Sequence, residues 1–134
     1  ASSVVKLVVT EQESRALRDF LAAGGRKTSS EILLTESVRA IKHRAAARGD
    51  EGLPELGGLA SLVEGFELSS LNRDVLVRAG GLAPSALGTL DAIHVATAMS
   101  LPHASLCFVS YDRRQLDAAR RAGLETASPG AEAA

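Results

Sequence analysis

The sequence of 134 residues predicts an α/β fold built around a mostly parallel β-sheet. Residues 88–101 are apolar on almost every side of a helix, which is typical of a helix that is buried all round. Residues 106–109 then form a short continuous apolar run, as in a strand covered on both faces. Helical patterns alternate with short strand-like stretches along the rest of the chain, and this alternation favours parallel pairing.

Hydrophobic periodicity and capping residues divide the chain into helices and short strands. The Val-rich start at 4–9 fits either a strand or a helix, and Thr10 with Glu13 is the pattern of a capping box for the helix that follows. Asn72 is a predicted N-cap, and Pro54 suits a first helical turn. The expected helices span 11–23, 30–48, 54–63, 73–79, 88–101 and 113–122, and the expected strands span 65–71, 106–109 and 124–127. The short polar stretch 26–30 fits either a strand or a capping segment.

Composition and charge narrow the class of protein. Lys and Arg number 15 against 16 Asp and Glu, so a net charge of −1 gives no overall basic field that would attract nucleic acid. Basic clusters at 42–48 and 113–121 offer local phosphate contacts, although such runs are more often solvated helix faces. Cys107 is the single cysteine, and no apolar run approaches the roughly 18 residues of a membrane span. We expect one cytoplasmic domain over residues 1–134.

Isolated carboxylates are the candidates for chemistry, because the sequence carries no phosphate-binding glycine loop and no nucleophile elbow. Asp91 stands in a predicted first helical turn, and Asp112 follows a predicted strand at the edge where α/β sheets bind ligands. Hard oxygen ligands that converge there suit Mg²⁺ or Mn²⁺, and such ions align water against a phosphodiester.

Each candidate side chain also has a purely structural interpretation. Asp91 in a first turn favours the helix dipole by about 0.3–1 kcal/mol, and Asp112 suits the N-cap of the next helix. Periodicity places Glu36 away from the apolar stripe of its helix, which predicts a solvent-facing pair with Arg39. His94, three residues after Asp91, is a conceivable metal ligand, but a lone histidine in an apolar helix is more often a satisfied core residue.

Two longer motifs carry a family resemblance. Residues 90–98 read Leu-Asp-Ala-Ile-His-Val-Ala-Thr-Ala, and residues 108–116 read Phe-Val-Ser-Tyr-Asp-Arg-Arg-Gln-Leu. Together with 2–11, 35–40 and 127–130, these segments resemble PIN-domain ribonucleases, and specifically the VapC-type toxins of bacterial toxin–antitoxin pairs. The resemblance runs through nearly the whole chain in the same order.

The resemblance implies a three-layer α/β/α PIN-like sandwich with a mostly parallel central sheet. It implies a Mg²⁺- or Mn²⁺-dependent endoribonuclease of tRNA or rRNA, held inactive by a VapB-like antitoxin, and we also expect a homodimer. Glu36, Asp91 and Asp112 inherit the catalytic and metal-holding acid positions. Ser2 and Ser110 occupy positions where the family often has a small hydroxyl beside the site, so they are candidate contacts to substrate.

The sequence departs from the family at one acid. The family's first aspartate ends a central first strand that would directly precede Ala1, so we expect upstream sequence to supply both the strand and the acid. The alternative interpretation is a degenerate module that binds an antitoxin or another partner without cutting RNA.

An acidic site suggests how an antitoxin would block it. We expect the antitoxin tail to point an Arg or Lys at the three acids through a charge-assisted hydrogen bond. Its apolar anchors should lie among the helices that follow Glu36 and Pro54, where Leu56, Leu59 and Val63 would leave apolar surface uncovered.

Overall fold

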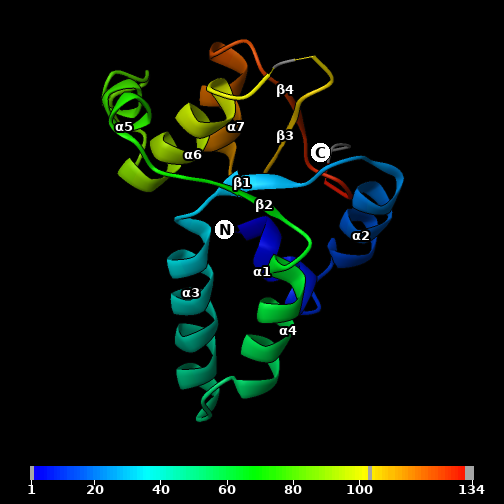
Figure 1. Ribbon diagram of the computed structural model, residues 1–134. Coiled ribbons are helices and arrows are strands. Elements are labelled where there is room, and N and C mark those ends of the chain that lie inside the picture. Colours follow the sequence, from blue (N-terminus) through cyan, green and yellow to red (C-terminus); the bar gives the residue numbers. More distant parts are fainter. Residues whose placement is uncertain (1, 103, 132–134) are drawn as a thin grey trace.

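The computed structural model describes residues 2–102 and 104–131. Helices and short strands alternate along this part of the chain (Figure 1). The helices are α1 (Ser2–Val8), α2 (Ser14–Ala23), α3 (Leu33–Arg48), α4 (Leu53–Val63), α5 (Arg73–Gly80), α6 (Thr89–Met99) and α7 (Arg113–Arg121), and the strands are β1 (Thr28–Ser30), β2 (Glu67–Ser69), β3 (Cys107–Val109) and β4 (Glu125–Ala127). None of the helices in these ranges is long and apolar enough to cross a membrane.

The strands pair in parallel, as the sequence predicts, but they form two separate pairs. β1 pairs with β2 in the register Ser29↔Leu68, and β3 pairs with β4 in the register Phe108↔Thr126. Each strand is only three residues long, so the pairs depend on the helices packed against them. A cavity of about 410 Å³ is lined by both β1 and β3 and separates the two pairs.

Helices cover the strands on both sides and give three layers (Figure 1). α5, α6 and α7 form the upper layer in this view, and α1, α3 and α4 form the lower one. A separate hydrophobic cluster fills the space on each side of the strands. Val95 and Leu124 belong to the upper cluster, and Leu33 and Ile41 belong to the lower cluster. The predicted α/β/α arrangement is confirmed.

Helix α6 is buried on nearly every side, as its sequence predicts. Six of its 11 residues are buried, because small and branched apolar side chains occupy all of its faces. Thr97 is the polar residue among these six, and its hydroxyl donates to the Ile93 carbonyl at 2.8 Å, within the same helix. Asp91 and His94 are only partly buried, so they mark the edge of the covered surface.

The Val-rich start forms a helix, α1, and the expected capping box at Thr10 is wrong. Helix α2 begins at Ser14, and no side chain caps its first turn. Glu13 pairs with Lys6 at 3.0 Å, which draws the glutamate toward α1 rather than toward a helix-start amide. Lys6 also lies 4.8 Å from the centre of the Tyr111 ring, so this corner is tied to the segment that follows β3.

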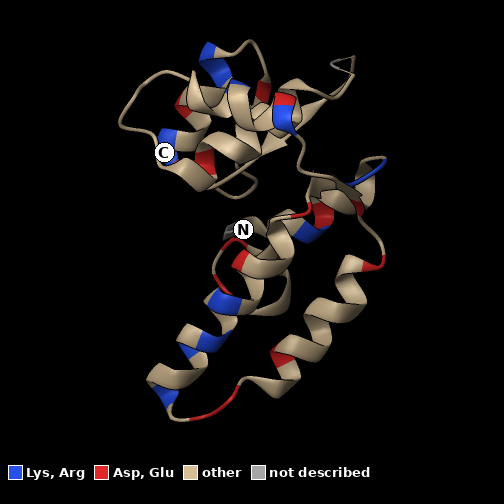
Figure 2. Cartoon of the chain, turned by 60° about the vertical axis from the view of Figure 1, so that its left-hand side comes forward, with Lys and Arg blue, Asp and Glu red and all other residues tan. Residues whose placement is uncertain are grey.

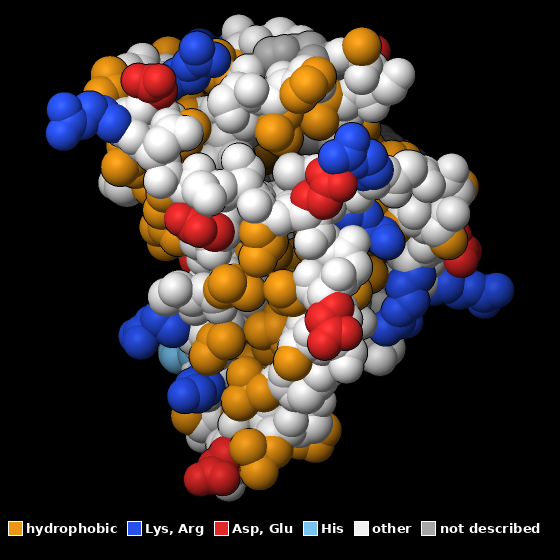
Figure 3. All heavy atoms as spheres, viewed as in Figure 1, with side chains coloured by type: hydrophobic (Ala, Val, Ile, Leu, Met, Phe, Trp, Pro, Cys, Tyr) orange, Lys and Arg blue, Asp and Glu red, His pale blue; other side chains and the backbone are white. Residues whose placement is uncertain are grey.

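The apolar surface expected between α3 and α4 is only partly covered. Leu59 is buried, and Leu56 and Val63 pack against the lower cluster, because α4 lies against both α1 and α3. Leu59 therefore adds no surface to the expected groove, whereas Leu56 and Val63 stay partly exposed. Leu34 and Leu53 are exposed, and Figure 3 shows the apolar side chains that remain visible on one face of the molecule.

The burial of two helical valines predicts that their substitution by alanine changes the free energy of unfolding by very different amounts. Val95 in α6 is 0% exposed, and Val77 in α5 is 71% exposed. Val95→Ala should lower the free energy of unfolding by about 2 kcal/mol, because it removes two buried methyl groups and leaves a cavity. Val77→Ala should change it by less than about 0.5 kcal/mol. Urea unfolding followed by circular dichroism measures both, and equal effects would contradict the burial of α6.

Candidate functional site

Three acidic side chains stand at the starts of helices. Glu36 lies in the first turn of α3, which follows β1, and Asp112 immediately precedes α7, which follows β3. Asp91 lies in the first turn of α6. Helix starts favour negative charge, and the carboxyl ends of parallel strands are where α/β folds gather ligand-binding groups.

The pKa of Asp91 reflects two neighbouring carboxylates. Burial raises this pKa most, and the negative charges of Asp112 and Glu36 raise it further, whereas His94 lowers it. The carboxylate of Asp91 also accepts a long hydrogen bond of 3.4 Å from Gln115 Nε2. Repulsion between carboxylates held by a fold is relieved when a cation binds between them.

Asp112 has the structural role that its sequence position suggests. It is the N-cap of α7, and its Oδ1 accepts hydrogen bonds from the amides of Arg114 and Gln115 at 2.8 and 3.1 Å. Within the described residues, Oδ2 accepts no hydrogen bond. The cap therefore fixes the carboxylate and leaves one oxygen for another ligand.

Glu36 does not face solvent, so its interpretation as a surface partner of Arg39 is wrong. Its side chain is 16% exposed and accepts a short hydrogen bond from His94, whose side chain is 9% exposed. We assign the donated proton to Nε2, because a carboxylate can only accept. Burial raises the pKa of Glu36, but the hydrogen bond and charge of His94 outweigh it, so the pKa lies below its usual range. Periodicity failed because the first turn of α3 meets α6 as well as the lower cluster.

Gln115, which the sequence patterns did not single out, connects Ser110 to Asp91. Ser110 is 1% exposed, and its hydroxyl donates to Gln115 Oε1 at 2.6 Å while accepting from the Asp112 amide at 3.1 Å. Gln115 in turn donates to Asp91. The Ser110 hydroxyl is thus engaged within the protein. A capping-box pattern was the signal available in the sequence, because Gln115 is the third residue after the N-cap Asp112.

The chemical nature of the three carboxylates suits a hard divalent cation. Mg²⁺ and Mn²⁺ prefer the oxygen ligands that Glu36, Asp91 and Asp112 supply, and the repulsion at Asp91 favours a cation. Across residues 2–102 and 104–131, however, no group of three or more His, Cys, Asp or Glu side chains stands close enough to hold one ion. Side-chain rotation, or a further acid, would be needed to complete a metal site.

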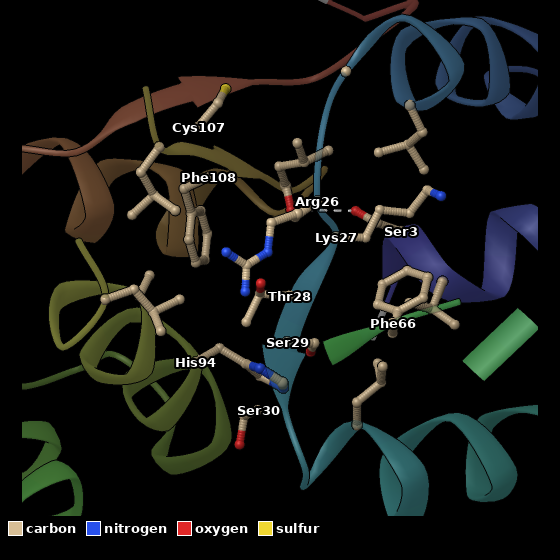
Figure 4. A pocket seen from close by; sticks show the side chains of 18 of the residues that line it. Ser3, Arg26, Lys27, Thr28, Ser29, Ser30, Phe66, His94, Cys107 and Phe108 are labelled. Atoms are coloured by element: carbon tan, nitrogen blue, oxygen red, sulfur yellow. Dashed lines mark hydrogen bonds between the residues drawn. The ribbon is translucent and has the colours of Figure 1, made fainter. Parts of the chain in front are cut away.

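A cavity lies between the strand pairs, and Figure 4 shows His94, the hydrogen-bond partner of Glu36, among the side chains that line it. Thr28–Ser30 of β1 and Cys107–Val109 of β3 line it, and so does His94. The hydroxyl of Ser3, on α1, donates to a carbonyl of β3 at 3.4 Å. The side chain of Ser2, the other hydroxyl expected near the site, lies outside the described residues.

Basic side chains follow one another along α3, where Figure 2 shows Lys and Arg on successive turns. Several of them already have acidic partners. Arg44 pairs with Glu11, and Arg48 pairs with Asp50 at 2.8 Å and with Glu55 at 3.0 Å. Any phosphate contact by this cluster would have to compete with these carboxylates.

Comparison with known proteins identifies the family. Residues 1–121 match the family described as PIN domain. The chain belongs to the PIN-domain family. It is 36% identical over 129 residues to Ribonuclease VapC46 of Mycobacterium tuberculosis strain H37Rv, covering 96% of this chain and 94% of the relative. It is 34% identical over 134 residues to Ribonuclease VapC47 of strain CDC 1551 of the same species, covering 97% and 94% of the two chains. This PIN domain is therefore of the VapC type.

The raised pKa of Asp91 predicts that its charge destabilises this PIN domain when no cation is bound. An acid whose pKa is raised by folding contributes stability below its unfolded pKa, about 3.9, and loses that contribution as the pH rises through the folded pKa. Asp91→Asn should therefore raise the free energy of unfolding at pH 7, by at most about 1 kcal/mol because solvent screens this carboxylate. Below about pH 4, Asp91→Asn and the unsubstituted protein should have the same free energy of unfolding. Urea unfolding across this pH range measures it.

Asp74→Asn is the matched control, because Asp74 also stands in a first helical turn, that of α5. Losing this charge should lower the free energy of unfolding by about 0.3–1 kcal/mol at pH 7, through the helix dipole alone. A loss of the same size for Asp91→Asn would assign Asp91 to the helix dipole instead of to a repelling cluster.

Proposed function

We propose that this chain is a metal-dependent endoribonuclease, the toxin of a toxin–antitoxin pair. The observation that carries the proposal is the placement of Asp91 between two other carboxylates, because the charges of Asp112 and Glu36 both raise its pKa. The names of the relatives, each a Ribonuclease VapC, support RNA as the substrate. Mg²⁺ or Mn²⁺ is the proposed cation, since both prefer oxygen ligands.

The site residues would divide the work of phosphodiester hydrolysis. Glu36, Asp91 and Asp112 would hold the cation, whose chemistry is to activate water and to stabilise the leaving oxygen. The N-cap bonds restrain Asp112, and Gln115 restrains Asp91, so these acids are already oriented before RNA binds. For Ser110 we propose a positioning role in place of a substrate contact, because its hydroxyl is occupied by Gln115.

We propose that a further acid completes the set of metal ligands formed by Glu36, Asp91 and Asp112. The family resemblance implies an aspartate at the end of a central strand before Ala1. The cavity supports this proposal, because β1 and β3 both line it and each has one strand partner within the described residues. A strand in that position would join the two pairs into one sheet. An upstream reading frame without an apolar segment ending in Asp would contradict this part of the proposal.

The proposed substrate class is tRNA or rRNA, and the proposed partner is a VapB-like antitoxin. Exposed Leu34, two residues before Glu36 on α3, supports an apolar anchor from which a basic side chain of the antitoxin tail would reach the acids. Exposed Leu76 and Val77 on α5 support a homodimer. We propose a single cytoplasmic domain spanning 1–134. A chain that stays monomeric and ignores the product of the neighbouring small reading frame would contradict both partner proposals.

The alternative is a degenerate PIN module that binds its partner without cutting RNA. Two contacts favour it, because Asp112 already serves as an N-cap and Glu36 already pairs with His94. Each contact uses one oxygen of its carboxylate, so both acids keep an oxygen for a metal. RNA cleavage therefore distinguishes the two functions.

Cleavage of purified tRNA and rRNA by the full-length protein tests the proposed function. We expect Mg²⁺ or Mn²⁺ to support cleavage and EDTA to abolish it. Asp112→Asn should reduce the rate by about 100-fold, because it removes a metal-binding charge. It should leave the fold intact, since asparagine caps a helix as well as aspartate does.

Asp117→Asn on the same helix is the control, because Asp117 pairs with Arg121 at the exposed surface and should not affect cleavage. A rate for Asp112→Asn equal to that of the unsubstituted protein would remove Asp112 from the site. No cleavage by the full-length protein in either metal would favour the degenerate module.

A further inference from the structure

We propose that His94 is a positioning residue that holds the Glu36 carboxylate at the metal site. This inference rests on the proposed function, since it concerns how that site keeps one of its acids in place. His94 lies on α6, three residues after Asp91, and Glu36 lies on α3. The hydrogen bond from His94 Nε2 to Glu36 Oε1 thus brings an acid of the lower layer beside an acid of the upper layer.

The surroundings of His94 restrict it to this contact. The buried faces of α6 fix the rotation of the helix, and the imidazole extends from it to the cavity wall near β1 (Figure 4). Because both side chains are largely screened from water, Glu36 would be a costly unpaired charge without a donor. Among the described residues, no other side chain donates a hydrogen bond to this carboxylate.

The contact uses only one oxygen of Glu36. His94 meets Oε1, so Oε2 is left to face a cation or a metal-bound water. A donor behind a metal-ligating side chain fixes the orientation of that ligand, and its loss typically costs about 10–100-fold in metal affinity. If the His94–Glu36 hydrogen bond only joined the two layers, its loss would lower the stability of the fold and leave metal affinity unchanged.

Mn²⁺ affinity, measured by electron paramagnetic resonance on the full-length protein without RNA, separates these two roles. His94→Leu keeps much of the volume of the side chain and removes the donor, so it should weaken Mn²⁺ binding by about 10–100-fold. His94→Gln keeps a donor close to the position of Nε2 and should stay within about threefold of the unsubstituted protein. His43→Leu, at an exposed histidine of α3, should have no effect.

A second pair of variants tests whether His94 acts through Glu36. In a Glu36→Gln background, His94→Leu should change Mn²⁺ affinity by less than about twofold, because the carboxylate that it positions is already gone. His94→Asn, whose amide matches Nδ1 better than Nε2, provides a polar variant that should also weaken binding if His94→Leu does not fold.

Unchanged or tighter Mn²⁺ binding by folded His94→Leu would overturn the inference. An equal loss of Mn²⁺ affinity on His94→Leu substitution with Glu36 and with Glu36→Gln would also overturn it. Tighter binding would mean that His94 competes with the metal for Glu36. If the unsubstituted full-length protein binds no Mn²⁺ and cuts no RNA, the proposed function fails and the role of His94 fails with it. Cleavage and binding that survive in His94→Leu would refute only the role of His94.

Discussion

The burial of α6 constrains the rest of the structure. A helix of 11 residues without a wide polar face has to be covered all round, so α5, α7 and β1 pack against it. This covering fixes the rotation of the helix, and Asp91 and His94 then lie at its partly buried edge. There Asp91 meets the charges of Asp112 and Glu36, while His94 meets Glu36 directly.

Local patterns predicted much of the fold. The apolar faces of α6 and the run at 106–109 indicated a buried helix followed by a strand, and Asn72 caps α5 as expected, with its Oδ1 2.9 Å from the Val75 amide. Local patterns do not encode which strands become neighbours, so the division into two pairs could not be predicted from them. The start of α2 was missed for a related reason, since a pair between Glu13 and Lys6 replaced the expected cap.

The site was predictable in part. Asp91 and Asp112 stood out because each lies at the end of an apolar element, whereas only the family resemblance pointed to Glu36. The partner of Glu36 lies 58 residues away in sequence, and a helical periodicity contains no information about such a contact. Gln115 illustrates the converse case. The capping-box spacing from Asp112 to Gln115 was visible in the sequence, but the side chain bonds Ser110 and Asp91 instead, and these contacts depend on the folded arrangement.

In the proposed function, Glu36, Asp91 and Asp112 share one cation, and this sharing would link the fold to the chemistry. Anomalous diffraction from crystals of the full-length protein soaked in Mn²⁺ tests this sharing most directly. We predict one strong anomalous peak in contact with Asp91 and Asp112 and reached by Glu36, directly or through a bound water. A peak elsewhere on the protein, or no peak while these three carboxylates keep their present partners, would contradict the metal site.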